Sequence, residues 1–140
     1  MTQPHTTVAR AYWAVTLLLL CIGAVMAYMA PTDASAGPIQ KLIYLHLPVA
    51  INSLAAALVV GLASVAYIHS RGSRWDDLAQ ATAAVTVLNA TVLLLTGMFW
   101  AKVAWGHWWV WSPRLSFSLA FWFLYLVYLV IRRRIRPATR

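Results

Sequence analysis

Four long apolar runs that contain no Asp, Glu, Lys or Arg constrain this chain more than any other feature. The runs cover residues 11–30, 42–68, 78–101 and 115–131. A helix needs about 20 apolar residues, within a range of roughly 17–25, to cross the hydrocarbon core of a bilayer. We therefore predict an all-α, polytopic membrane protein with four transmembrane helices. The predicted helices cover residues 11–30, 47–68, 78–99 and 115–132, each to within a few residues.

The composition supports this class and limits the organisation of the chain. Hydrophobic residues make up 62% and charged residues 10%, whereas an ordinary soluble domain has about 45–50% and about 25%. No internal repeat or linker is visible, so we expect residues 1–140 to form a single membrane domain. Cys21 is the only cysteine, which excludes a disulfide framework within one chain and the Cys-x-x-Cys-His pattern of covalent haem attachment.

The basic residues are distributed unevenly between the predicted loops. The chain has 11 Lys and Arg against 3 Asp and Glu, and in a soluble protein this excess would suggest a nucleic-acid partner. In a chain with four spans it instead fits the positive-inside rule. If both termini are cytoplasmic, only Lys41, Lys102 and Arg114 lie outside, so we predict this orientation, membrane lipid as a partner of the basic tail, and no nucleic-acid partner. The basic residues on the cytoplasmic side are then Arg10, Arg71, Arg74, Arg132, Arg133, Arg134, Arg136 and Arg140.

A cluster of tryptophans lies between the third and fourth apolar runs, in Trp105-Gly106-His107-Trp108-Trp109-Val110-Trp111. Tryptophan has a large flat apolar face and one N–H donor, which suits either a membrane interface or a planar ligand. At helical spacing Trp105, Trp108 and Trp109 share a face, whereas at strand spacing Trp105, Trp109 and Trp111 align. An aromatic belt at the lipid headgroups and a binding platform both remain open.

His46 lies just before Pro48, and a proline in this position suits the first turn of a helix. We therefore expect the second helix to begin near Pro48 and His46 to lie at the membrane boundary. Two crossings separate His46 from the tryptophan cluster, so both lie on the same side of the membrane in either orientation. The simplest interpretation of His46 is an interfacial histidine bonded to water or to a carbonyl. Neutral imidazole is also a common ligand of haem iron.

Two segments together resemble the CcmC family of haem-handling proteins in cytochrome c maturation. In that family a Tyr-x-His-x-Pro segment opens the second helix, as Tyr44-Leu45-His46-Leu47-Pro48 does here. A loop of the form Trp-Gly-x-Trp-Trp-x-Trp-Asp-x-Arg-Leu precedes the fourth helix, and residues 105–115 follow this form with Ser112 in the acidic position. The resemblance extends over about residues 38–131 and includes the helical hairpin between the two segments.

The resemblance implies a multi-pass protein of the bacterial inner membrane that holds haem b non-covalently at the outer, periplasmic face. It would present or transfer this haem for c-type cytochrome biogenesis, with the haem chaperone CcmE and other cytochrome c maturation subunits as partners. His46 would be the axial ligand of the haem iron. The charge and position of Arg114, and these alone, suggest that it pairs with a haem propionate. The haem-binding residues that the resemblance implies are His46, Trp100, Trp105, Gly106, Trp108, Trp109, Trp111 and Arg114, and Lys102 also matches a position of the family's loop.

The sequence departs from the family pattern in two places. The family has six spanning helices and a second axial histidine beyond the fourth, for which residues 1–140 contain no counterpart. We expect this second ligand to come from His107, from a partner chain, which we prefer, or not at all, with a five-coordinate iron. The family's acidic residue is replaced by Ser112, so a role that depends on its charge is lost or moved.

The main alternative is a structural subunit or scaffold of a membrane transporter or assembly complex that does not bind haem. The loss of the acidic residue and the short length favour it. We do not expect an enzyme, because the acidic residues Asp33, Asp76 and Asp77 are loop residues distant from the tryptophans in sequence. Export of haem through this chain alone is also not expected, since few polar side chains lie within the predicted spans.

Overall fold

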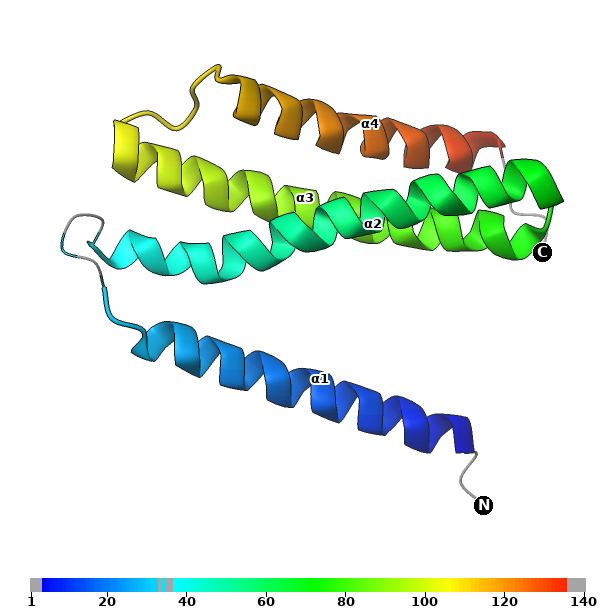
Figure 1. The fold of residues 1–140 in the computed structure, drawn as a ribbon, viewed down its shortest axis with the longest axis horizontal. Helices are drawn as coiled ribbons and strands as arrows, with labels where there is room; N and C mark the ends of the chain where they lie inside the picture. The colour runs from blue at the N-terminus through cyan, green and yellow to red at the C-terminus, as the bar shows by residue number, and fades with distance from the viewer. Residues whose placement is uncertain (1–3, 33, 35–36, 136–140) are drawn as a thin grey trace. The chain divides into compact units, whose positions relative to one another are not determined.

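The computed structural model describes residues 4–32, 34 and 37–135, and all regular structure in these residues is helical. Figure 1 shows the helices in chain order, and the candidate spans they contain are long and apolar enough to cross a membrane. The prediction of an all-α protein with four long apolar helices, each able to cross a membrane by its length and composition, is therefore confirmed for the described residues. Arg136 and Arg140, which the sequence assigns to the cytoplasmic side, lie outside the described residues. The elements are α1 (Pro4–Met29), the short 3₁₀ helix η1 (Gly37–Leu42), α2 (Ile43–Ser70), α3 (Ser73–Trp105) and α4 (Pro113–Ile135).

The second helix begins earlier than its proline indicates. α2 starts at Ile43, and Pro48 lies inside it, so the prediction that the helix begins near Pro48, with His46 outside, is wrong. The physical reason is that η1 leads directly into α2, and Pro48 removes only one backbone hydrogen bond, the one to the Tyr44 carbonyl. His46 is therefore a residue of the first helical turn, and the helical backbone fixes its direction.

Contacts divide the chain into two units, residues 1–41 and residues 42–140. In the first unit the apolar side chains of α1 are exposed along its length. Near its end the Lys41 ammonium donates a hydrogen bond to the Tyr28 carbonyl and lies 5.2 Å from the centre of the Tyr28 ring. A helix that is apolar on all sides is stable in lipid rather than in water.

In the second unit α3 packs against both α2 and α4, and Figure 1 shows the three helices running side by side. Only Arg71 and Gly72 separate α2 from α3. Arg71 has a φ of 55°, in the left-handed region, and its N–H donates to the Tyr67 carbonyl at 2.7 Å. This hydrogen bond ends α2 and reverses the chain, so α2 and α3 form an antiparallel hairpin.

Alanine allows α2 and α3 to approach closely. Ala63 of α2 and Ala79 and Ala83 of α3 are at most 1% exposed, and Val60 completes a buried cluster with them. Small side chains let helix backbones come close in lipid, where van der Waals packing replaces the hydrophobic effect as the driving force. The larger side chains that pack against this cluster are Trp75, Tyr125, Tyr128 and Leu129.

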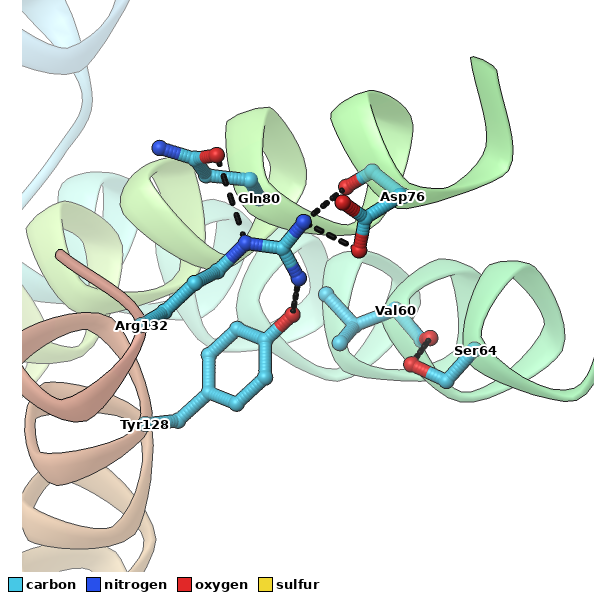
Figure 2. Close-up of polar contacts among 6 residues, drawn as sticks. All are labelled: Val60, Ser64, Asp76, Gln80, Tyr128 and Arg132. Atoms are coloured by element: carbon cyan, nitrogen blue, oxygen red, sulfur yellow. Dashed lines mark hydrogen bonds and ion pairs between the residues drawn. The ribbon is translucent and has the colours of Figure 1, made fainter. Parts of the chain in front are cut away.

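Several serine and threonine hydroxyl groups inside the spans donate to the backbone of their own helix. Ser64 Oγ donates to the Val60 carbonyl at 2.7 Å (Figure 2), and Thr86 Oγ1 donates to the Thr82 carbonyl at 3.0 Å. Each bond reaches back four residues, which is the usual geometry of serine and threonine in helices. The spans can therefore carry these hydroxyls in hydrocarbon without leaving a donor unpaired.

The hydrogen bond between Trp122 and Thr91 is one of the side-chain contacts that join α4 to α3. Trp122 Nε1 donates to Thr91 Oγ1 at 2.8 Å. We expect Trp122→Phe to lower the free energy of unfolding in detergent by about 1 kcal/mol, because hydrogen bonds between membrane helices contribute about 0.6–2 kcal/mol. Trp13→Phe on the exposed α1 is the matched control. An equal loss in both variants would assign the effect to ring size instead of the hydrogen bond.

The guanidinium of Arg132, near the end of α4, binds residues near the start of α3. Arg132 forms an ion pair with the Asp76 carboxylate and also donates to the Asp76 carbonyl at 2.9 Å, to Gln80 Oε1 at 3.3 Å and to Tyr128 Oη at 2.6 Å (Figure 2). The Arg132 and Asp76 side chains are 14% and 13% exposed. The sequence assigns Arg132 to a lipid-binding tail, whereas in the structure its guanidinium faces the protein.

Candidate functional site

A cavity of about 710 Å³ is lined by residues of α2, α3 and α4. Its walls are mainly apolar, and its volume lies within the range of roughly 300–1,000 Å³ that is typical of small-molecule sites. His46, Trp100, Trp105 and Arg114, all candidates from the sequence, contribute to its lining. The structure therefore brings together four residues that come from three helices.

His46 is held between α2 and α3. Its Nδ1 lies 2.8 Å from Thr96 Oγ1 of α3, and both residues line the cavity. A Cβ on Gly97 would lie 3.6 Å from His46 Cε1, so the backbone of α3 passes close to the imidazole. The hydrogen bond engages Nδ1, which leaves Nε2 as the ring nitrogen available to a ligand.

Of the tryptophans in the cluster, Trp105 lines the cavity, whereas Trp108, Trp109 and Trp111 do not. Trp105 is the last residue of α3. Trp108 packs edge-on against Phe99, with ring centroids 5.5 Å apart, and Lys102 Nζ lies 5.9 Å from its ring centre. Neither of the alignments that the sequence left open occurs, because the chain between α3 and α4, residues 106–112, is neither helix nor strand.

Two further tryptophans in this connection contact each other. Trp109 and Trp111 meet edge to face, with ring centroids 5.5 Å apart and an interplanar angle of 80°. Trp111 is 77% exposed, whereas Trp109 Nε1 is buried without a hydrogen-bond partner in the described part of the chain. Neither side chain lines the cavity.

Gly106 ends α3. Its φ of 76° is left-handed, and its N–H donates to the Lys102 carbonyl at 3.0 Å. The Lys102 ammonium in turn donates to the Gly106 carbonyl at 3.0 Å. A residue with a Cβ would be strained at this φ, so Gly106 turns the chain out of α3 at the edge of the cavity and does not line it.

Ser112 begins α4. Its hydroxyl accepts from the Leu115 N–H at 3.4 Å, and its carbonyl accepts from the Ser116 N–H at 2.9 Å. Pro113 follows as the first residue of the helix. Serine and aspartate are both favoured at this capping position, so Ser112 supplies a helix cap without the charge. The cap places Arg114 in the first turn of α4, where it lines the cavity.

Several sequence candidates are not part of the cavity wall, namely Gly106, His107, Trp108, Trp109 and Trp111. His107 is exposed. Among the described residues, no group of three or more His, Cys, Asp or Glu side chains could hold a metal ion.

Thr96 is the residue of the site that the sequence interpretation missed. It appears in the sequence as one of a few polar residues inside the third apolar run, and 50 positions separate it from His46. No local spacing signals the contact, because it depends on the register between α2 and α3.

The fold and the cavity define a class of all-helical membrane protein with an aromatic-lined cavity that contains a single imidazole. The family model described as CcmC, heme exporter protein C, matches residues 2–140, and the chain belongs to this family of non-enzymatic, haem-handling membrane proteins of cytochrome c maturation. The expectation that the chain is not an enzyme agrees with this membership.

The relatives are similar over most of this chain but are longer. Heme exporter protein C of Paracoccus denitrificans is 31% identical over 91% of this chain and 54% of its own length. The proteins of the same name from Rhodobacter capsulatus and Escherichia coli K12 are 32% and 35% identical, over 84% and 79% of this chain and 49% and 46% of their own lengths. The chain thus spans about half the length of the curated relatives it matches.

Proposed function

We propose that this chain binds haem b non-covalently in the cavity between α2, α3 and α4 and presents it at the outer face of the membrane for c-type cytochrome biogenesis. The observation that carries the proposal is the lining of the cavity, where His46, Trp100, Trp105 and Arg114 meet. Each of these side chains matches one part of the haem molecule. Membership of the heme exporter protein C family supports the same ligand.

The chemistry of the lining suits a porphyrin. Trp100 and Trp105 offer flat apolar faces to a flat apolar ring. The imidazole of His46 offers a nitrogen to the iron, which accepts neutral imidazole as an axial ligand. Arg114 offers a guanidinium to a propionate, and arginine pairs with carboxylates through two parallel hydrogen bonds. The cavity volume of about 710 Å³ leaves room for a ligand of this size.

The proposed orientation places the cavity outside. His46 and Arg114 lie near the start of α2 and of α4, while Arg71, Arg74 and Arg132 lie at the opposite ends of the helices. The larger group of basic residues is expected in the cytoplasm. We therefore place both termini in the cytoplasm of a bacterium and the cavity on the periplasmic side of its inner membrane, where the haem chaperone CcmE and other maturation subunits would meet it.

The second axial position of the iron is proposed to be filled by a partner chain or to remain open. His107 was the candidate within this chain, but it is exposed and does not line the cavity. The position of His107 therefore supports a ligand from elsewhere.

The remaining tryptophans of the motif are assigned to the rim of the site. Gly106, Trp108, Trp109 and Trp111 belong to the connection that follows Trp105, so they are proposed to contact the exposed edge of the haem or the protein that receives it.

A haem titration of the detergent-purified full chain tests the proposal, with Trp105→Ala and Trp111→Ala as a matched pair. We expect a shifted Soret band on binding, and an affinity about tenfold lower for Trp105→Ala, equivalent to about 1.4 kcal/mol. Trp111 is 77% exposed and lies off the cavity, so its variant should change the affinity by less than about threefold. A larger loss of affinity in Trp111→Ala than in Trp105→Ala would indicate that haem binds at the connection between α3 and α4 and not in the cavity. If the unmodified chain gives no specific Soret band, the alternative of a scaffold that does not bind haem is favoured.

A further inference from the structure

Thr96 has two acceptors within reach of its only hydroxyl proton. Its Oγ1 lies 2.8 Å from the Val92 carbonyl and 3.1 Å from the Leu93 carbonyl, both on its own helix. The third neighbour of the same oxygen is His46 Nδ1, at 2.8 Å. A hydroxyl has one proton to donate and two lone pairs that accept.

The backbone determines which way the bond between the two side chains runs. If the Thr96 proton goes to the Val92 or Leu93 carbonyl, as is usual for threonine inside a helix, Oγ1 can only accept from the imidazole. Nδ1 must then carry the proton of the neutral ring, and Nε2 has a free lone pair. If Thr96 instead donated to Nδ1, Nε2 would carry the proton and could not bind a metal.

We propose that Thr96 is a positioning residue that fixes His46 in the tautomer with Nδ1 protonated and Nε2 free to bind the iron. The proposal rests on the proposed function for its purpose, but the tautomer is a property of the chain without haem. The site is suited to this task, because Thr96 is only 8% exposed and few waters can compete for Nδ1. Outer-shell partners of metal-binding histidines set the tautomer and the ring orientation in this way.

The experiment compares three variants of the full chain in detergent. Thr96→Val removes the hydroxyl and keeps the shape, and Thr96→Ser restores the acceptor. Thr86→Val is the matched control, since Thr86 is buried in the same helix and bonded to a backbone carbonyl four residues back, at 3.0 Å. Any general effect of removing a threonine from α3 should appear in this control.

The first readout is the tautomer, measured without haem. In the ¹⁵N-histidine-labelled chain at a pH where His46 is neutral, we expect the proton on Nδ1, with the His46 signals assigned from their absence in His46→Ala. Thr96→Val should shift the ring toward the other tautomer, while Thr96→Ser and Thr86→Val should retain the original one. A proton on Nε2 in the unmodified chain, or no change in Thr96→Val, would overturn the proposal.

The second readout is the affinity for haem, followed by the Soret band. Thr96→Val should weaken binding by about 10–100-fold, the usual effect of removing an outer-shell partner, and Thr96→Ser should recover most of the loss. Equal binding by Thr96→Val and the unmodified chain would contradict the positioning role. If the unmodified chain binds no haem, the proposed function fails, and the tautomer measurement still decides the direction of the hydrogen bond.

Discussion

The full chain carrying His46→Ala should bind haem more than about 100-fold more weakly than the unmodified chain and lose the Soret shift that marks an axial imidazole. Removing even an outer-shell partner of a metal-binding histidine costs about 10–100-fold, so removing the ligand itself should cost more. His46 is the only histidine of the described residues on the cavity wall. Apolar contacts with Trp100 and Trp105 would remain and support weak, unligated binding.

Two further variants make this result decisive. His46→Gly leaves a space in which added free imidazole can replace the missing ligand, so recovery of the band with imidazole would show that the variant still folds. His69→Ala, an exposed histidine at the far end of α2, is the matched control and should bind haem like the unmodified chain. An unaltered band in His46→Ala would exclude His46 as the ligand and remove the main support for the cavity as the haem site.

Arg132→Met should destabilise the helical unit of residues 42–140 by about 3 kcal/mol. The variant removes an ion pair and two hydrogen bonds that connect α4 to α3, together with the hydrogen bond to Tyr128 within α4. It also takes the guanidinium away from the Asp76 carboxylate. Each hydrogen bond to a charged group contributes about 1.5–3 kcal/mol to stability. Breaking a buried ion pair by removing one partner costs about 3–5 kcal/mol. Unfolding of the detergent-solubilised chain by a denaturant measures the change.

Arg133→Met is the matched control, because Arg133 lies next to Arg132 on α4 and is exposed. It should change the free energy of unfolding by less than about 0.5 kcal/mol. A double-mutant cycle with Asp76→Asn should give a coupling energy of at least 1 kcal/mol between Arg132 and Asp76. If the losses of unfolding free energy in Arg132→Met and Asp76→Asn simply add in the double variant, the interaction between the two side chains does not stabilise the fold.

The class of fold could be predicted because it depends on local composition. The four charge-free runs each reach the range of roughly 17–25 residues that a spanning helix requires, so they predict spanning helices. The start of α2 could not be predicted in the same way. Pro48 is compatible with several positions near a helix start, and only the preceding 3₁₀ helix, which leads into Ile43, decides between them.

The residues of the candidate site that belong to sequence motifs could be predicted. Its contacts between packed helices could not. The resemblance supplied His46, Trp105 and Arg114 as candidates, and the cavity brings them together. Thr96 was missed as a partner of His46, and Arg132 as a partner of Asp76. Both pairs join helices that are distant in sequence, so their contacts depend on helix register and rotation, which periodicity does not determine.

The turn between α2 and α3 also bears on the register of the two helices. A connection of two residues, Arg71 and Gly72, spans at most about 7 Å, so the ends of α2 and α3 that it joins must stay at the same depth. The two helices therefore have little freedom to slide along each other at this end of the hairpin. The short turn in this way helps to keep the register that places His46 of α2 opposite Thr96 of α3.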